Sequence, residues 1–328
     1  MSLAFCAFFT AFTGASGVTI VALGGLLMPI LMQKGYSEKF TLGLITSSGS
    51  LGLLFPPSLP LILYGIVAKV PIDNLFKAGI APGVLIIIIL SAYCAFKATK
   101  SATRVDFSWA NVQSAISESK YELPLPLVVL GGIYGGIITV SEAATLTTLY
   151  VVVVEVFLYK DLSFKKDIPK LVVESMSLVG AILLILSCAM GLTNYLIDEE
   201  VPMKILDFLS QYITDKYIFL LLLNIFLLIV GSLMDIFSAI IVVVPLLLPI
   251  ANEFNVDPIH LAIIFLTNLE IGYITPPIGL NLFISSFRFN RSVLELYRAT
   301  FVYLILLVIA LLIITYVPWL STFWFLPS

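Results

Sequence analysis

Long apolar runs that are almost free of charged side chains constrain this chain more than any other feature. Hydrophobic residues make up 60% of the 328 positions and charged residues only 11%. About 20 apolar residues cross the hydrocarbon core of a bilayer, whereas runs of about 10–14 are typical of re-entrant or buried helices. Both lengths occur, so the pattern predicts an all-α integral membrane protein. The runs are Ile80–Phe96, Leu123–Val140, Ala143–Tyr159, Leu178–Ile197, Ile218–Val230, Ile236–Ala251 and Phe301–Val317.

The remaining composition excludes several classes of protein. The net charge is −3 and no basic tract is present, which argues against a nucleic-acid partner. The three cysteines lie far apart in apolar segments, so they do not form a metal-ligand or disulfide pattern. The single histidine, His260, excludes most zinc sites and Ser-His-Asp triads, and we expect it at the outer membrane interface. We therefore expect no resident cofactor.

The basic residues predict how the chain is threaded. Most of the 17 Lys and Arg residues lie in four connections, at 34–39, 97–120, 160–170 and 288–298. Basic connections remain in the cytoplasm. The predicted spans are then 39–70, 79–96, 123–140, 142–159 with a turn at Ser141-Glu142, 175–196, 259–286 and 299–318, and the C-terminus is periplasmic. Residues 1–32 and 217–250 must each begin and end on one face, so they are predicted to be re-entrant hairpins that enter from opposite sides.

An offset of 220 residues aligns two segments of the chain without a gap. Inverted repeats with broken helices are typical of secondary transporters. The alternative is a chance alignment of membrane helices that are rich in proline and glycine. The second copy has three helices, at about 123–196, before its hairpin, so the repeat predicts that the chain is N-terminally truncated by roughly 100 residues, or that another chain supplies them. The aligned positions are Pro29 with Pro249, Gly52 with Gly272, and Pro56-Pro57 with Pro276-Pro277.

Polar and proline residues predict a broken helix in each copy. The first contains Thr46–Ser50 and Pro56-Pro57, and the second contains Thr267–Glu270 and Thr275–Pro277. A break frees carbonyl oxygens, and irregular backbone inside a membrane is tolerated where it lines a cavity. Hard cations such as sodium prefer oxygen ligands, and helix N-termini attract anions. The alternative is that the serines bond to the preceding helical turn.

Each hairpin tip is expected to face one broken helix and to form a sodium site with it. The first set of candidate ligands is Ala15, Ser16, Gly17, Ser47, Ser48 and Gly49. The second set is Gly231, Met234, Asp235, Thr267 and Asn268. We expect Ser16, Ser48, Ser50, Asn268 and Thr275 to contact the substrate.

Two acids inside apolar segments, Asp235 and Glu270, are functional candidates because buried charge is costly in a membrane. They leave open a carboxylate-dyad intramembrane enzyme, which we consider an alternative to transport. Asp235 has a second alternative, that it is solvated at its hairpin tip. Glu155 is expected to snorkel to the interface and Glu142 to have a structural role.

The same motifs resemble a known family. Gly14-Ala15-Ser16-Gly17, Ser47–Gly52 with Pro56-Pro57, and Asn268–Gly272 with Thr275–Phe283 are similar to the large permease subunit of tripartite ATP-independent periplasmic (TRAP) transporters. The resemblance implies an elevator-type carrier in the bacterial inner membrane. It also implies sodium-coupled uptake of organic acids such as C4-dicarboxylates or sialic acids, with a small four-helix membrane subunit and a periplasmic solute-binding protein as partners.

The resulting expectation is a secondary active transporter and not an enzyme. Its parts would be a first hairpin and broken helix (1–70), a helix with a cytoplasmic connection (71–122), scaffold-type helices (123–197), a second hairpin and broken helix (198–286) and a C-terminal helix (287–328). A third alternative is a truncated fragment that does not transport.

Overall fold

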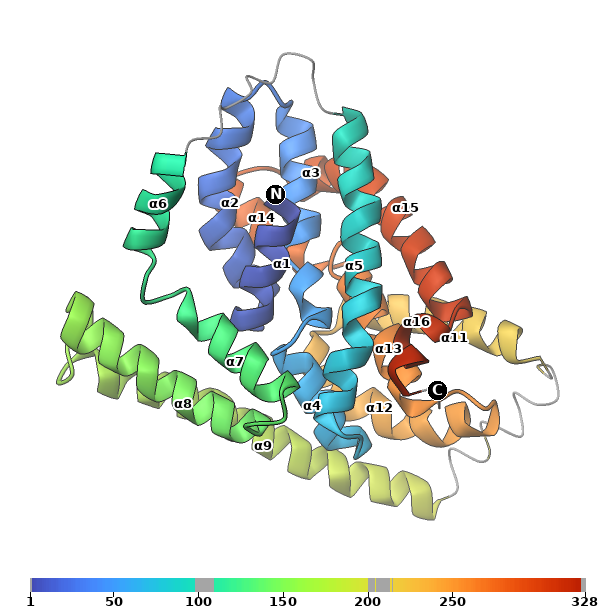
Figure 1. The fold of residues 1–328 in the computed structure, drawn as a ribbon. Helices are drawn as coiled ribbons and strands as arrows, with labels where there is room; N and C mark the ends of the chain where they lie inside the picture. The colour runs from blue at the N-terminus through green and yellow to red at the C-terminus, as the bar shows by residue number, and fades with distance from the viewer. Residues whose placement is uncertain (1, 98–108, 200–203, 205–212, 214, 326–328) are drawn as a thin grey trace. The chain divides into compact units, whose positions relative to one another are not determined.

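The computed structural model describes residues 2–97, 109–199, 204, 213 and 215–325, and in these ranges all regular structure is helical (Figure 1). The chain divides into two compact units, described separately below. The first consists of Met1–Thr103 and Ala189–Ser328, and the second of Arg104–Cys188. Lys100 and Arg104, two basic residues of the connection at 97–120 that was used to assign the sides, lie outside the described residues.

The first unit begins with a helical hairpin and a broken helix. The helices are α1 (Ser2–Thr13), α2 (Ser16–Gln33), α3 (Glu38–Ser48), the 3₁₀ turn η1 (Leu51–Leu54), α4 (Leu59–Ala68) and α5 (Ile72–Lys97). α1 and α2 turn at Gly14, whose φ of 65° suits glycine. The hairpin therefore breaks within Thr13–Gly17, as the sequence predicted.

The second part of the first unit repeats this order. Its helices are α11 (Lys216–Leu233), α12 (Ile236–Glu253), α13 (Pro258–Gly272), α14 (Leu280–Phe289), α15 (Val293–Tyr316) and α16 (Trp319–Thr322). Adding 220 to the bounds of α2 gives the bounds of α12. The peptide bonds Pro56-Pro57 and Pro276-Pro277 are both cis. The 220-residue offset predicted from sequence is thus present at the level of helix order.

The first broken helix is interrupted within the predicted segment, whereas the second is interrupted later than predicted. α3 ends at Ser48, Gly49 and Ser50 form a turn before η1, and the chain bends by 44° between η1 and α4. In the second copy, Thr267–Glu270 remain inside α13, and the irregular segment is 273–279. The expectation of unwound backbone at Thr267–Glu270 was wrong, because the Thr267 hydroxyl bonds to the Ile263 carbonyl and leaves the helix intact.

The two halves of the first unit interlock through their helices. α1 packs against η1 and α11 against α13, so one arm of each hairpin lies on its own broken helix. The other arms cross over: α2 packs on α14, and α12 packs on α4. α3 also packs along α15, where Gly43 faces the Ala299 backbone and the Tyr303 ring.

The second unit contains α6 (Trp109–Glu118), α7 (Pro124–Tyr134), α8 (Val140–Val153) and the π-helical turn η2 (Val154–Tyr159), and α9 (Asp167–Asp198) begins in it. α7 ends before the predicted span 123–140 does, and Gly136 turns the chain with a φ of 66°. α8 then starts with a capping box between Thr139 and Glu142. The predicted turn at Ser141-Glu142 is therefore displaced to residues 135–139, and Glu142 has a capping role.

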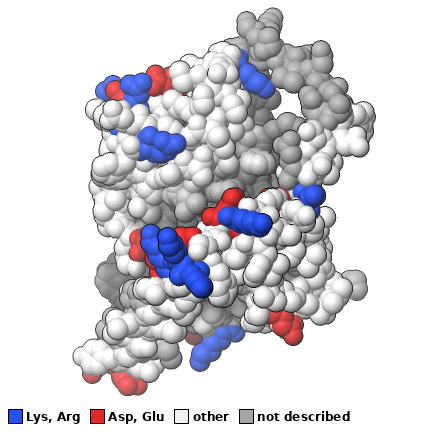
Figure 2. Space-filling model, turned by 90° about the vertical axis from the view of Figure 1, so that its left-hand side faces the viewer, with Lys and Arg blue, Asp and Glu red and all other residues white. Residues whose placement is uncertain are grey.

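Six helices of the described part are long and apolar enough to cross a membrane, or seven if the bent pair α3–η1 and α4 counts as one span. Many large apolar side chains on these helices are exposed, among them Leu26, Ile88, Ile229 and Ile305. The face shown in Figure 2 carries only scattered charged side chains. Such a surface suits lipid rather than water.

Replacing Gly43 with Ala should destabilise the contact between α3 and α15. A methyl group there would collide with the Ala299 carbonyl oxygen. Overpacking of this kind costs about 1–3 kcal/mol, so the midpoint of thermal unfolding in detergent should fall. Gly191→Ala is the control, because no atom lies within 4 Å of the added methyl group. An unchanged midpoint for Gly43→Ala would contradict the described packing.

Candidate functional site

A cavity of about 580 Å³ lies between the two hairpin tips of the first unit. The first tip, residues 14–17, contributes all four of its residues to the lining, and the second tip, residues 231–235, contributes Asp235. Ile236 and Phe237 from the start of α12 and Tyr273 from the second irregular segment also line the cavity, and most of its lining is apolar. Residues more than 200 positions apart in the chain thus meet at one cavity.

The two helix N-termini at this cavity differ in their capping. Asp235 accepts hydrogen bonds from the backbone N–H groups of Phe237 and Ser238, at 2.9 and 3.1 Å, and so caps α12. α2 begins after Ala15, and no side chain caps it. The first N–H groups of a helix have no partner within the helix, and the end carries partial positive charge. The first tip is therefore the more electropositive end of the cavity.

A buried threonine ties the first hairpin to the first broken helix. The Thr10 hydroxyl lies 2.8 Å from the carbonyl oxygens of both Gly49 and Cys6, which share its one proton, and 2.6 Å from the Thr19 hydroxyl. Gly49 also lies close to Ser16, because a Cβ atom added to Gly49 would be 3.3 Å from the Ser16 carbonyl oxygen. The first tip and the predicted segment Ser47–Gly49 are therefore neighbours.

The second hairpin meets the second broken helix through backbone contact and an amide pair. Gly231 lies against Leu269 and Gly272 with no room for a side chain on either glycine. The Asn268 amide nitrogen donates to the Asn224 amide oxygen at 2.7 Å. The predicted proximity of Gly231 to the segment Thr267–Glu270 is thus present.

Buried oxygen atoms without a hydrogen-bond partner gather in the broken helices and the segments that follow them. Buried polar atoms normally have partners, so such atoms point to a ligand. Within the described ranges, the side-chain oxygens of this kind belong to Ser47, Ser50, Ser58, Asn268, Glu270 and Asn281. Ser47, Ser50 and Asn268 were among the predicted site residues.

Other predicted site residues use their side chains locally. The Ser48 hydroxyl bonds to the Ile45 carbonyl at 3.2 Å, and the Thr275 hydroxyl bonds to the Ile271 carbonyl at 2.8 Å. Thr267 bonds within α13 in the same way. The hydroxyls of all three residues bond to the preceding helical turn, which is the alternative stated above for the serines. Met234 is exposed at the end of α11.

The two acids do not form a dyad. Asp235 is exposed and bonds to its own helical turn, whereas neither carboxyl oxygen of Glu270 has a hydrogen-bond partner. Leu269 and Gly272 face α11, so at 3.6 residues per turn the Glu270 side chain leaves α13 on the opposite side. The facing carboxylates that an intramembrane enzyme would need are therefore not formed.

The prediction for His260 was also wrong. We expected an interfacial side chain, but the ring is buried, with Nδ1 2.7 Å from the Ser321 hydroxyl and Nε2 3.2 Å from the Thr315 carbonyl oxygen. The tie to α15 and α16 replaces the water that an interfacial histidine would bind.

The sequence reasoning missed five residues that organise the site. Thr10 and Asn224 tie the hairpin arms to the broken helices, and the Tyr273 hydroxyl accepts a bond from the Ile236 N–H at 2.8 Å. Ser285 and Asn281 of α14 bond to Thr46 of α3. A lone polar residue in an apolar run, such as Asn224, was the available signal.

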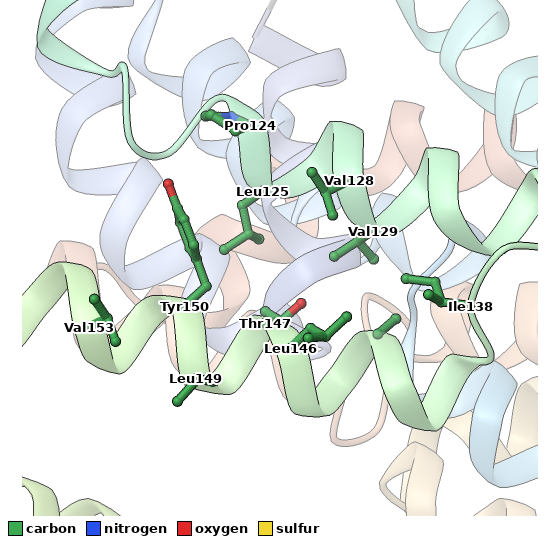
Figure 3. A pocket seen from close by; sticks show the side chains of 11 residues that line it. Pro124, Leu125, Val128, Val129, Ile138, Leu146, Thr147, Leu149, Tyr150 and Val153 are labelled. Carbon is green, nitrogen blue, oxygen red and sulfur yellow. The ribbon is translucent and has the colours of Figure 1, made fainter.

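A separate cavity of about 390 Å³ lies in the second unit, between α7 and α8 (Figure 3). Leu125, Val128 and Val129 of α7 lie opposite Leu146 and Thr147 of α8. The lining is almost entirely apolar, so this cavity offers no ligands for an ion or an anion.

Comparison with known proteins gives a consistent family. A family model described as the tripartite ATP-independent periplasmic transporter, DctM component, matches residues 1–320. The chain is 36% identical to the isethionate TRAP transporter permease protein DctMQ of Oleidesulfovibrio alaskensis, over 97% of this chain and 50% of that protein. It is 34% identical to the C4-dicarboxylate TRAP transporter large permease protein DctM of Pseudomonas aeruginosa, over 96% of this chain and 74% of that protein.

A third relative, the ectoine/5-hydroxyectoine TRAP transporter large permease protein UehC of Ruegeria pomeroyi, is 31% identical over 97% of this chain and 74% of its own length. The chain thus spans half of one of these relatives and about three quarters of the other two. It is a multi-pass integral membrane protein of a bacterial transport system. It belongs to the family of DctM components of TRAP transporters, which are transporter permeases and not enzymes.

The Thr10–Thr19 pair offers a test of the first hairpin. Thr10→Val removes the donor to the Gly49 carbonyl and should lower the free energy of unfolding by about 1–3 kcal/mol, because a buried acceptor loses its partner. Thr19→Val should also destabilise the protein. In a double-mutant cycle by thermal unfolding, we expect the two losses to be non-additive by about 0.5–3 kcal/mol. Simple additivity would show that the two hydroxyls do not interact.

Proposed function

We propose that this chain forms the membrane core of a TRAP transporter that takes up a small organic anion together with sodium ions. The observation that carries the proposal is the set of buried, unpartnered oxygens in the two broken helices and the segments that follow them. Sodium is a hard cation that prefers such oxygen ligands. Within the described residues no group of three or more His, Cys, Asp or Glu side chains is present, so a cation there would be held mainly by hydroxyl, amide and carbonyl oxygens.

Two sodium sites are proposed, one at each hairpin. The first is formed by Ala15, Ser16, Gly17, Ser47, Ser48 and Gly49, and the second by Gly231, Met234, Asp235, Thr267 and Asn268. The contacts of Gly49 with Ser16, and of Gly231 with Leu269, support these groupings. The hydroxyls of Ser48 and Thr267 donate their protons within the helix, so the lone pairs of their oxygens remain available to a cation.

The substrate is proposed to bind in the cavity between the tips. Its anionic group would lie at the uncapped N-terminus of α2, beside Ser16, where backbone N–H groups and the helix dipole favour negative charge. The further candidate contacts predicted from the sequence are Ser48, Ser50, Asn268 and Thr275, none of which lines this cavity. The relatives are named for isethionate, C4-dicarboxylates and ectoines, all small compounds with an acidic group, and the chain itself does not select among them.

Transport is proposed to follow an elevator mechanism built on an inverted repeat. The recurrence of helix order after 220 residues and the crossed packing of α2 on α14 and α12 on α4 support the repeat. The first unit would carry the ions and the substrate, and helices within 123–197 would act as the scaffold. At 100 mV, each sodium ion that moves inward contributes about 2.3 kcal/mol.

The proposed setting is the inner membrane, with the C-terminus in the periplasm. The proposed partners are a small four-helix membrane subunit and a periplasmic solute-binding protein. The relative named DctMQ supports the small membrane subunit as a partner, because its name combines M and Q components in one protein.

Sodium should stabilise the purified protein specifically. A ligand at 100 times its dissociation constant adds about 2.7 kcal/mol to the free energy of unfolding, so the thermal midpoint in detergent should rise with sodium but not with potassium at equal ionic strength. Ser47→Ala should reduce the response, because it removes one of the unpartnered oxygens. Ser177→Ala is the matched control, since that exposed hydroxyl bonds only to the Val173 carbonyl of its own helix.

Measurements of uptake test the proposed sodium coupling functionally. In sealed vesicles that contain the chain with its two proposed partners, an inward sodium gradient should drive accumulation of an organic anion. Equal responses to sodium and potassium in both assays would refute the proposed coupling ion.

A further inference from the structure

Asn224 is a buried amide in the middle of an apolar helix, α11 (Figure 1). Only 3% of the residue is exposed, and it was not among the residues expected to bind an ion. Its oxygen accepts from the Asn268 amide nitrogen at 2.7 Å, and its nitrogen donates to the Thr315 hydroxyl at 3.1 Å. Asn224 therefore connects three helices, α11, α13 and α15, through one side chain.

The orientation of the Asn268 amide follows from its partners. The same Asn268 nitrogen also donates to the Ile264 carbonyl oxygen at 2.8 Å, and a carbonyl oxygen can only accept. Both amide hydrogens are thus used, and the nitrogen must lie on the side of Asn224 and Ile264. The Asn268 oxygen is left on the other side, fully buried and without a partner.

We propose that Asn224 is a positioning residue for the cation at the second broken helix. By accepting from the Asn268 nitrogen, it holds the Asn268 oxygen toward the ion. If that amide turned over, it would present N–H donors to the cation in place of an oxygen ligand. Asn224 is not a ligand in this arrangement, because its own oxygen already accepts from Asn268 and lies 3.3 Å from the Thr315 hydroxyl, which also donates to it.

The neighbouring bonds keep Asn224 itself in one orientation. The donation from the Asn268 nitrogen directs the Asn224 oxygen toward Asn268, and the Thr315 hydroxyl holds the same amide through bonds to its nitrogen and its oxygen. The Thr315 carbonyl lies 3.2 Å from the His260 ring, whose other nitrogen lies 2.7 Å from the Ser321 hydroxyl. These buried hydrogen bonds hold Thr315, and Thr315 in turn holds the Asn224 amide, as outer partners commonly do for metal ligands.

This inference rests on the proposed sodium coupling. The test uses the full chain in detergent, with sodium titrated against potassium and the midpoint of thermal unfolding as the readout. Asn224→Leu keeps the approximate volume but removes the acceptor, so we expect about tenfold or more weaker sodium response, the range for lost outer partners. Asn224→Asp keeps an oxygen that accepts from Asn268 in either protonation state, and it should retain most of the response. Leu223→Ala, a buried neighbour on α11, is the packing control.

The outcomes separate the two proposals. If wild-type protein responds to sodium and Asn224→Leu responds with the same midpoint concentration, the positioning role is refuted while the coupling ion stands. If wild-type protein itself shows no sodium-specific response, the coupling ion is refuted and the positioning role with it. Loss of the response in Leu223→Ala as well would indicate general loosening and would also overturn the positioning role.

A second variant covers the case in which Asn224→Leu does not fold. Thr315→Val removes the hydroxyl that bonds to both polar atoms of the Asn224 amide but leaves Asn268 and Asn224 in place. It should weaken the sodium response without abolishing it, because the Asn224 side chain is then held by Asn268 alone. A wild-type response in this variant would overturn the proposed support of Asn224.

Discussion

Helices are interrupted inside apolar segments of this structure, and the backbone polar groups freed there need hydrogen-bond partners. The packing of the hairpins on the broken helices depends on this requirement. In lipid, an unbonded N–H or C=O group costs several kcal/mol, so an interruption must be repaired by protein. The second irregular segment is repaired by three contacts: the Gly279 N–H donates to the Ser232 carbonyl, the Asn281 N–H donates to the Tyr273 carbonyl, and the Ile236 N–H donates to the Tyr273 hydroxyl. The hairpin tips and the broken helices therefore stabilise each other, and neither can be understood alone.

Glycine makes this mutual repair possible, because it lets backbones approach without side chains between them. Gly52 in η1 lies against the Ala7 and Ala11 backbone of α1, and 220 residues later Gly272 lies against Gly231 of α11. Equivalent positions of the two segments thus use the same close approach of one hairpin arm to its broken helix. Each tip rests on a helix that is held close at its base, which confines any rearrangement to the tip and the irregular segment.

The sequence could predict the features that depend on local backbone chemistry. Glycine and proline report where a helix must stop, so the tips at Thr13–Gly17 and Gly231–Asp235 and the 220-residue offset could be inferred without a structure. Prediction from the sequence failed where a polar side chain can either break a helix or bond within it. Thr267 was predicted to lie in a helix break but bonds to its own helix, and Asn224, whose partners the sequence does not reveal, connects three helices. Such choices depend on which side chains meet in space, and no single-sequence pattern contains that information.

The repeat does not make the two halves of the site chemically equal. In the first broken helix the free oxygens are the hydroxyls of Ser47 and Ser50, whereas in the second they are the Asn268 amide oxygen and the Glu270 carboxyl oxygens. The tips differ in the same direction, because Asp235 caps α12 while α2 begins without a cap. Negative and strongly polar groups are thus concentrated on the second side, and free N–H groups on the first. If the proposed anion binds in the cavity between these tips, the asymmetry favours one orientation, with the charged group toward α2.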